Sequence, residues 1–412
     1  MSLYVLALVL TGEMGNMPVV VAFLLASMVA LLMARGAFSQ RIAVFCRGAA
    51  NETVLLMVLI FVLAGAFAGT AKAMGAVDAT VNMALALLPH NMIPASLFIA
   101  ACFISMSMGT SCGTIAALTP VAVGIAPQIG MGVPAMVGII VGGAMFGDNL
   151  SFISDTTIVA TRTQDVEMRD KFRVNFRIVL PMAIICTGIY LYQGFQLEGA
   201  ITATPTVSWA KIIPYLAVLA AAFAGMNVIL VLMLGVVLAG VIGLATGGFG
   251  LLEWAKAANV GVVGDMGELI IVSLLAGGLF ELVRERGGIA WLVAKLTRGV
   301  KSERKAESRI ALLTALTNIC TANNTIALLI VGPIARKVGD HANLNRKRTA
   351  SILDTASCFA QSLLPYGAQL LIATGLAHGI SPTSVVPHLY YPMLIGVAVT
   401  LSIIFRYPRR TC

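Results

Sequence analysis

Charged residues are scarce in this sequence. Asp, Glu, Lys and Arg make up 11% of its 412 residues, whereas 59% are hydrophobic. A soluble domain carries about 25% charged residues and needs polar surface to cover its core, so this composition excludes one. The uncharged stretch 212–252 would extend about 62 Å as a helix, enough for two passes through a ~30 Å hydrocarbon core. The sequence therefore predicts an all-α polytopic membrane protein.

Other classes of protein are excluded by what the remaining composition lacks. The seven cysteines are odd in number and lie mostly inside apolar runs, so no disulfide framework is indicated. The four histidines have no metal-binding spacing. The net charge of +9 comes from basic residues between apolar stretches, where membrane topology explains them better than nucleic acid does. We expect no nucleic-acid partner and no cofactor.

Short matches recur in order along the chain at a nearly constant separation of 211 to 213 residues. They pair 63–65 with 275–277, 114–116 with 325–327, 160–161 with 373–374, and 181–182 with 392–393. One short match arises by chance, but an ordered run of them at one offset does not. The chain is therefore predicted to contain two copies of one unit, in residues 1–200 and 201–412.

Both copies show the same order of apolar segments. The predicted segments are 2–11, 17–34, 52–71, 76–88, 95–127, 133–161 and 178–195, and then 212–224, 227–246, 266–284, 288–299, 309–335, 349–377 and 390–405. The stretches 95–127 and 309–335 have polar centres unsuited to lipid, so both are predicted to be re-entrant hairpins. The spans 133–161 and 349–377 are interrupted by polar residues.

The distribution of basic residues predicts the topology. With five crossings and one hairpin in each copy, 24 of the 27 Lys and Arg residues lie on the cytoplasmic side. Because five is odd, the second copy is inverted relative to the first, and both termini are cytoplasmic. Inverted repeats with interrupted helices are typical of secondary transporters, whose sites lie near mid-membrane. We expect a multi-pass protein of the cell (inner) membrane, in contact with lipid.

The first interrupted span carries two carboxylates in an apolar setting. An Asp at the centre of a membrane helix costs ~2.5–3.5 kcal/mol on insertion scales, which indicates a functional role. Carboxylate, hydroxyl and amide oxygens suit a hard cation such as Na⁺. Asp155 is predicted to be the Na⁺ ligand. The candidate cation-binding and proton-coupling residues are Asp148, Asn149, Ser151, Ser154, Asp155, Thr156 and Thr157.

The second copy keeps the break but lacks these acids. At an offset of 213, Gln361 stands for Asp148 and Ala368 for Asp155, which favours one titratable cation site over two. The candidate wall residues from this copy are Gln361, Gln369 and Asp354. Asp354 could equally pair with cytoplasmic Arg and Lys side chains. The hairpin tips add candidate substrate or ion contacts at Thr110, Ser111, Thr114, Asn323, Asn324 and Thr325.

Residues 147–157, Gly-Asp-Asn-Leu-Ser-Phe-Ile-Ser-Asp-Thr-Thr, resemble the signature of the NhaC-type sodium/proton antiporter family of the ion-transporter superfamily. Residues 109–114 and 365–369 resemble its hairpin and its second-half motif. The resemblance implies an elevator-type homodimer, in which transport elements 95–161 and 309–377 move against a scaffold of the remaining helices. Asn149 and Phe152 depart from the family pattern, in which Lys and Pro are common, so a counter-charge beside Asp148 is lost.

Two transport functions remain open. Exchange of Na⁺ for H⁺ by alternating access is favoured. The alternative is Na⁺-coupled transport of an amino acid or small organic acid, including malate/lactate-type exchange. A membrane-embedded hydrolase that uses Asp148 and Asp155 is disfavoured because both acids lie in one broken segment, and a Tyr-Asp motif on a separate helix is missing. The sequence predicts a transporter and not an enzyme.

Overall fold

A computed structural model describes residues 19–87, 89–151, 154–197, 208–224, 226–297 and 302–408. Every regular element in these residues is a helix, as the composition predicts. The predicted apolar segment 2–11 and Phe152 lie outside the described residues.

The helices follow one another with short connections. In chain order they are α2 (Val19–Met33), α3 (Phe38–Ala49), α4 (Glu52–Ala73), α5 (Ala76–Leu87), η1 (His90–Met92), α6 (Ile93–Met108), α7 (Ser111–Gln128), α8 (Val133–Leu150), α9 (Asp155–Gln164), α10 (Met168–Phe195), α11 (Trp209–Phe223), α12 (Val228–Ala245), α13 (Leu251–Asn259), η2 (Val260–Asp265), α14 (Gly267–Glu285), α15 (Gly288–Thr297), α16 (Glu303–Thr321), α17 (Asn324–His341), α18 (Arg346–Ser362), α19 (Ala368–Leu376), α20 (Pro382–Val385), η3 (Val386–His388) and α21 (Tyr390–Phe405).

These bounds agree closely with the predicted segments. The stretch 95–127 forms the helix pair α6–α7, and 309–335 forms α16–α17. The interrupted spans appear as α8–α9 and α18–α19, each with a break where polar residues were expected to end the helix. Three short helices, α3, α13 and α20, were not predicted. The helix α10 begins at Met168, inside the stretch 162–177 that the charge distribution assigned to a loop.

Several helices are long and apolar enough to cross a membrane. In the described parts of the chain these are Val54–Ala73, Val133–Gln164, Met168–Phe195 and Val228–Ala245. The pair Pro382–His388 and Tyr390–Phe405, bent by 59°, adds a fifth if it forms one span. The chain is thus an all-helical polytopic membrane protein, while the ten crossings stay a prediction.

Each helix pair turns at a residue with left-handed backbone. Gly109 separates α6 from α7 with φ 71°, and Ala322 separates α16 from α17 with φ 52°. Glycine adopts this conformation freely, whereas alanine is strained in it, so surrounding contacts must hold the second tip. Both hairpins thus reverse direction through one residue with left-handed backbone.

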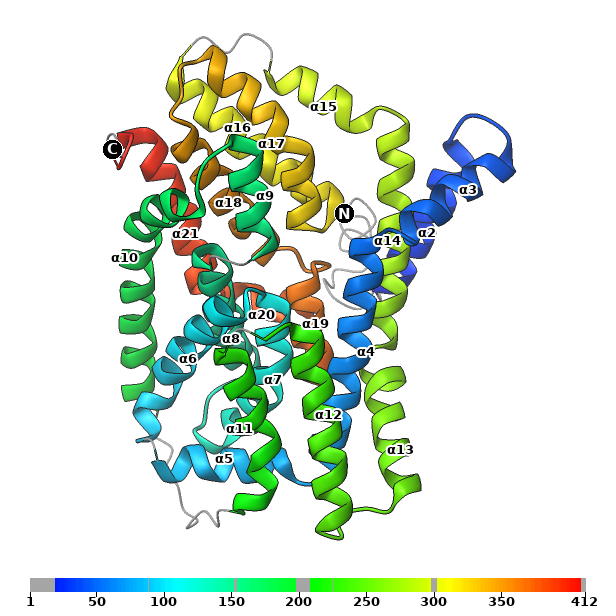
Figure 1. The fold of residues 1–412 in the computed structure, drawn as a ribbon, viewed down its shortest axis with the longest axis vertical. Coiled ribbons are helices and arrows are strands. Elements are labelled where there is room, and N and C mark those ends of the chain that lie inside the picture. Colours follow the sequence, from blue (N-terminus) through cyan, green and yellow to red (C-terminus); the bar gives the residue numbers. More distant parts are fainter. Residues whose placement is uncertain are drawn as a thin grey trace.

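The hairpins lie in opposite halves of the molecule, α16–α17 in the upper half of Figure 1 and α6–α7 in the lower half. Each packs against the first part of its own interrupted helix, α8 or α18. The part after each break packs against the other hairpin, since α9 contacts α17 and α19 contacts α7. Both breaks consequently lie between the two hairpins.

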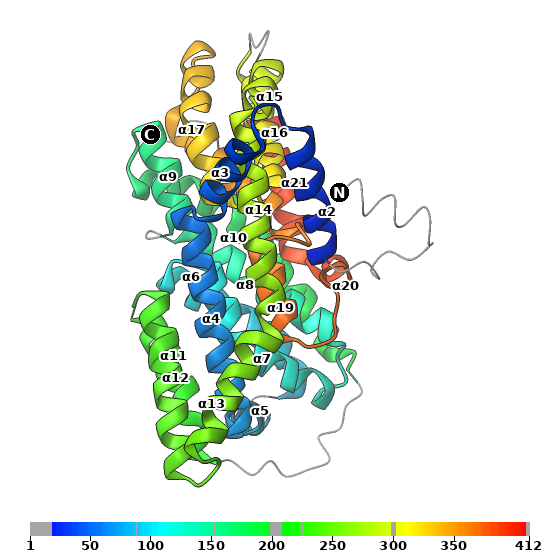
Figure 2. The same cartoon turned by 90° about the vertical axis from the view of Figure 1, so that its right-hand side faces the viewer.

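Other helices flank this centre. On one side α10 packs along α21. On the other side α4 contacts α12, α13 and α14, and Figure 2 shows α4 and α14 running along the long axis of the molecule. The short helices α5 and α15 lie near the lower and upper ends (Figure 1).

Two glycines bring α8 close to the first hairpin. A Cβ added at Gly143 would lie 2.6 Å from the Ala101 Cβ, and one added at Gly147 would lie 2.6 Å from the Met106 nitrogen. The four-residue spacing places both glycines on the α8 face that meets α6. This close approach sets Asp148, the next residue, beside the hairpin tip.

Candidate functional site

Asp148 lies in the last turn of α8 with 5% of its surface exposed. Ser111, the first residue of α7, donates a hydrogen bond of 2.9 Å from its Oγ to Asp148 Oδ2. A carboxylate near a helix C-terminus faces the negative end of the helix dipole, whereas the N-terminus of α7 presents the positive end of another. The turn at the first hairpin tip therefore helps to hold the charge of Asp148.

A chain of hydrogen bonds links Asp148 to the second hairpin. Gln361 Nε2, at the end of α18, donates to the carbonyl of Ala322 at 3.2 Å and to Gln369 Oε1 at 2.8 Å. Gln369 Nε2, on α19, donates in turn to Ser111 Oγ at 3.1 Å. From Gln361 through Gln369 and Ser111 the donors run toward Asp148, whereas the bond from Gln361 to Ala322 runs toward the second hairpin tip. The predicted wall residues Gln361 and Gln369 and the tip residue Ser111 thus meet at this carboxylate.

Asp354, in the middle of α18, is fully buried and forms an ion pair with Lys171 of α10. The Lys171 Nζ lies 2.7 Å from Asp354 Oδ2. The same oxygen accepts hydrogen bonds from Asn149 Nδ2 at 2.9 Å and Asn175 Nδ2 at 3.0 Å. Both interpretations of Asp354 therefore stay open, because its ion-pair partner Lys171 is one of the basic residues expected on the cytoplasmic side, while Asn149 belongs to the candidate cation-binding residues.

The break between α8 and α9 leaves backbone carbonyls without helical partners. Ser154 Oγ donates to the carbonyl of Asp148 at 3.0 Å, and Thr157 Oγ1 donates to that of Ser151 at 2.9 Å. Lys171 Nζ reaches the carbonyl of Asn149 at 2.5 Å. The hydroxyls predicted around the carboxylates therefore hold the broken backbone, and Ser154 also caps α9.

Lys171 was missed because the sequence groups it with exposed basic residues in a presumed loop. It is completely buried in the first turn of α10, and Asn175 lies four residues later on the same face. That polar pair at helical spacing, next to the buried Ile178 and Val179, was the available signal. Asn149 stands where lysine is common in the family pattern, and an ammonium group nevertheless lies beside it, supplied by Lys171 of α10.

A buried cluster holds the carboxylates of Asp148 and Asp354 and the ammonium of Lys171, and Asp148 interacts electrostatically with both of these partners and with Asp155. With all three groups ionised, its net charge is −1. Several buried oxygens have no hydrogen-bond partner among the described residues: Asp354 Oδ1, Asn175 Oδ1, Gln361 Oε1, Ser351 Oγ and Thr355 Oγ1. Oxygens of these types are the ligands that hard monovalent and divalent cations take.

Asp155 interacts with Asp148 by charge but takes no part in the hydrogen bonds described above. It is exposed at the start of α9, and no hydrogen bond or ion pair joins it to the other candidate residues in the described chain. Thr156, its neighbour, is buried within 3.1 Å of Ser154 Oγ. Thr110 and Thr114 contact each other locally, since Thr114 Oγ1 donates to the Thr110 carbonyl at 3.0 Å. Na⁺ binding by Asp155 stays a prediction.

The polar side chains at the tip of the second hairpin make contacts other than those around Asp148. Asn323 caps α17 by accepting a hydrogen bond from Ile326 N at 3.0 Å, and its Nδ2 contacts Met57 Sδ at 3.3 Å. Asn324 Oδ1 accepts from the amide of Thr325 at 3.1 Å. Of these three predicted contact residues, Asn323 faces α4, while the Ala322 carbonyl connects the tip to Asp148 through Gln361.

Comparison with known proteins gives a consistent result. A family model described as the Na⁺/H⁺ antiporter family matches residues 3–195 and 198–407. The chain is 24% identical over 383 residues to the malate-2H⁺/Na⁺-lactate antiporter of Bacillus subtilis, covering 85% of this chain and 80% of that protein. It is 23% identical over 352 residues to the Na⁺/H⁺ antiporter NhaC of the same organism, covering 77% and 76%. A solved structure of the Alcanivorax borkumensis YdaH transporter aligns with a TM-score of 0.47 at 13% identity, over 95% of this chain and 99% of that one.

Proposed function

The chain belongs to the Na⁺/H⁺ antiporter family, and we propose that it exchanges the two ions at the buried cluster of Asp148, Asp354 and Lys171. The proposal rests on the net charge of this cluster, which is −1 when all three groups are ionised. Two buried carboxylates with one ammonium leave a single uncompensated negative charge, which is costly away from water. One Na⁺ or one H⁺ neutralises it, so the two ions compete for the same site.

Asp148 is the carboxylate at which the two ions compete. Its Oδ2 is held by one neutral hydroxyl, Ser111, whereas Asp354 Oδ2 already accepts from an ammonium and two amides. The less satisfied carboxylate gains most from a bound cation. Buried oxygens without partners, on Asp354 and Asn175, complete the candidate ligand set. Lys171 balances Asp354 whichever ion occupies the site.

Asp155 attracts Na⁺ toward this site without binding it as a ligand. Its carboxylate is exposed at the N-terminus of α9, directly after the break. An exposed charge acts on a cation over roughly a Debye length, about 8–10 Å at physiological salt. Asp155 therefore raises the local Na⁺ concentration at the mouth of the site, and the ligand itself is Asp148.

Alternating access requires two arrangements of the hairpins, and we propose that they belong to inverted repeats, residues 1–200 and 201–412. The exchanged packing of α9 on α17 and α19 on α7 supports this symmetry. So does the position of α5 and α15 near opposite ends of the molecule (Figure 1). In the proposed elevator, residues 95–161 and 309–377 move against the remaining helices, in a homodimer of the cell membrane with cytoplasmic termini.

Na⁺-coupled movement of a small organic solute is the second candidate function. A cavity beside the second hairpin tip, separate from Asp148 and with Glu281, Arg284 and Asn323 in its lining, favours it. One relative named above is a malate/lactate exchanger, so organic solutes occur among the relatives of this chain.

Proteoliposomes with a pH gradient test the proposal. Na⁺ added to the wild-type protein should collapse the gradient, as read by a pH-sensitive dye. Asp148→Asn should abolish this exchange while the protein still inserts. Asp155→Asn should keep the maximal rate and raise the half-saturating Na⁺ concentration about two- to five-fold, as for a screened surface charge. Asp165→Asn, at a side chain 74% exposed, is the matched control and should behave as wild type.

Wild-type exchange in Asp148→Asn would refute the assignment of the ligand. Complete loss in Asp155→Asn with normal exchange in Asp148→Asn would restore Asp155 as the ligand. If the wild-type protein does not collapse the gradient with Na⁺ alone, the exchange proposal fails and the solute-coupled function takes its place.

A further inference from the structure

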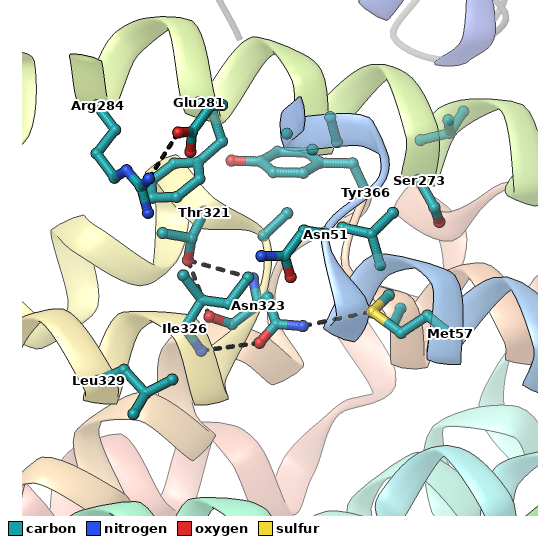
Figure 3. Close-up of a pocket in the computed structure, with 18 of the residues that line it drawn as sticks. Asn51, Met57, Ser273, Glu281, Arg284, Thr321, Asn323, Ile326, Leu329 and Tyr366 are labelled. Atoms are coloured by element: carbon teal, nitrogen blue, oxygen red, sulfur yellow. Dashed lines mark hydrogen bonds and ion pairs between the residues drawn. The ribbon is translucent and has the colours of Figure 1, made fainter. Parts of the chain in front are cut away.

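A second cavity lies between the tip of the second hairpin and the helices α4 and α14 (Figure 3). Its volume is about 170 Å³. The tip contributes Thr321, Ala322 and Asn323, and the segment before α19 contributes Tyr366. None of the residues that bind at Asp148 lines it. It is a separate chamber, at the junction of the proposed moving and fixed parts.

The cavity contains one charged residue of each sign among its described lining residues, Glu281 and Arg284. They lie three residues apart on α14, with Arg284 Nη2 2.6 Å from Glu281 Oε1. The Glu281 side chain is 9% exposed and that of Arg284 53%. A guanidinium has five N–H donors and a carboxylate has two acceptor oxygens. The pair therefore keeps both donor and acceptor capacity for a ligand, and its net charge is zero.

Asn323 presents a weakly satisfied amide to the same space. Its Nδ2 donates to Met57 Sδ at 3.3 Å, and a thioether is a poor acceptor. Figure 3 shows Asn323 and Asn51 on the cavity side of the tip and of α4, between Tyr366 and Met57. An oxygen of a ligand would be a better partner for the Asn323 amide than the sulfur is.

We infer that this cavity binds a small zwitterion of the α-amino acid class. A carboxylate and an ammonium in one ligand match Arg284 and Glu281, whereas a simple anion would face the Glu281 carboxylate without compensation. A cavity of about 150 Å³ accepts a benzene molecule in a protein core, so this one holds a ligand of alanine or serine size. Apolar walls at Val272, Phe280 and Ile326 leave room for a short side chain.

The second tip connects this cavity to the cation site. Thr321 and Ala322 line the cavity, and the Ala322 carbonyl accepts from Gln361, the first link of the chain that ends at Asp148. A ligand that shifts the tip changes that link. The binding site stands on the cavity alone, while its coupling to Na⁺ rests on the proposed function.

Equilibrium binding to the purified full-length protein tests the inference, with radiolabelled L-alanine as probe. L-lactate is the matched competitor because a hydroxyl replaces the ammonium at nearly constant size. Saturable alanine binding that excess lactate does not displace is expected. Arg284→Gln and Glu281→Gln should each weaken alanine binding about 10- to 100-fold, as for the loss of a charge-assisted hydrogen bond. Glu285→Gln, an exposed neighbour on α14, is the control and should bind as wild type.

Breaking the ion pair could also unfold the protein, so Asn323→Ala is a second variant that leaves both charges in place. It should weaken alanine binding about five-fold, the value of one neutral hydrogen bond. Absence of saturable alanine binding, equal displacement by lactate, or unchanged affinity in all three variants would overturn the inference.

Na⁺/H⁺ exchange measured on the same preparations separates this inference from the proposed function. Normal exchange without alanine binding would overturn the amino-acid site and leave the exchange site standing. Alanine binding in a protein that exchanges no ions would support the site and refute the exchange.

Discussion

Replacing Lys171 by Met tests the charge balance of the buried cluster. The change removes the ammonium 2.7 Å from Asp354 Oδ2 and leaves that oxygen with its two amide donors. The cluster then holds two buried carboxylates and no compensating cation. Removing one partner of a buried ion pair costs ~3–5 kcal/mol, since the other charge stays desolvated. Lys171→Met should be destabilised by about that amount.

The double variant Lys171→Met/Asp354→Leu is the matched control because it removes both charges and keeps apolar volume. Replacement of a whole buried pair by apolar residues is often neutral or stabilising, so most of the lost stability should return. Thermal unfolding of the purified proteins in one detergent, at one pH and salt concentration, measures the three melting temperatures. We expect the single variant to be the lowest.

Na⁺ supplies a second readout on the same proteins. A cation that binds only the folded state stabilises it by RT ln(1 + [L]/Kd). Without Lys171, Na⁺ meets a net charge of −2 in place of −1, so it should raise the melting temperature of Lys171→Met more than that of wild type. Choline at equal concentration controls for ionic strength. Equal destabilisation of the single and double variants, with no difference between Na⁺ and choline, would refute the charge argument and leave lost packing as the cause.

Three further variants probe other contacts. Ser111→Ala removes the hydroxyl on the central carboxylate and should raise the half-saturating Na⁺ concentration about five-fold, the value of one ~1 kcal/mol hydrogen bond, in the liposome assay. Gly147→Ala should lower the free energy of unfolding by ~1–3 kcal/mol because the added methyl group meets α6. Gly188→Ala is the control and should not lower it, because no atom lies within 4 Å of a Cβ added at Gly188. Glu307 is fully buried and forms an ion pair with Arg348 of α18, so Glu307→Gln should lower the free energy of unfolding by a few kcal/mol. Asp165 lies at the surface, so Asp165→Asn should lower it by ~1 kcal/mol or less.

Helix positions were predictable because each depends on a local run of sequence. The breaks at Gly109 and after Leu150 follow from polar residues and glycine inside apolar stretches, which cannot continue a lipid-facing helix. The helices α3, α13 and α20 were missed because none of them forms an apolar run of its own. Basic residues flank or enter α3, and α13 follows an apolar run directly.

The candidate cation site was only partly predictable because the residues around Asp148 come from both halves of the chain. Asp148 and Ser111 were found from local patterns, and their contact depends on the close packing of α8 on α6. Lys171 was hidden among exposed arginines, and its burial is a tertiary property of α10. The direct contact of Gln369 with Ser111 spans 258 residues, so no local spacing reveals it.

The direction of the hydrogen bonds explains how one ion at Asp148 can affect the distant tip. Ser111 has a single proton, which it gives to Asp148, and Gln369 must then offer Ser111 an N–H. When Asp148 carries a proton on Oδ2, that proton can point at Ser111 and reverse the chain. If the Ser111 proton then turns to Gln369, Gln369 presents its oxygen to Ser111 and its N–H to Gln361, whose Oε1 is buried without a hydrogen-bond partner among the described residues. Gln361 must turn to accept it, and the carbonyl of Ala322 then loses its donor. In the proposed exchange at Asp148, this reversed chain links protonation of the carboxylate to the contact between Gln361 and the second hairpin tip.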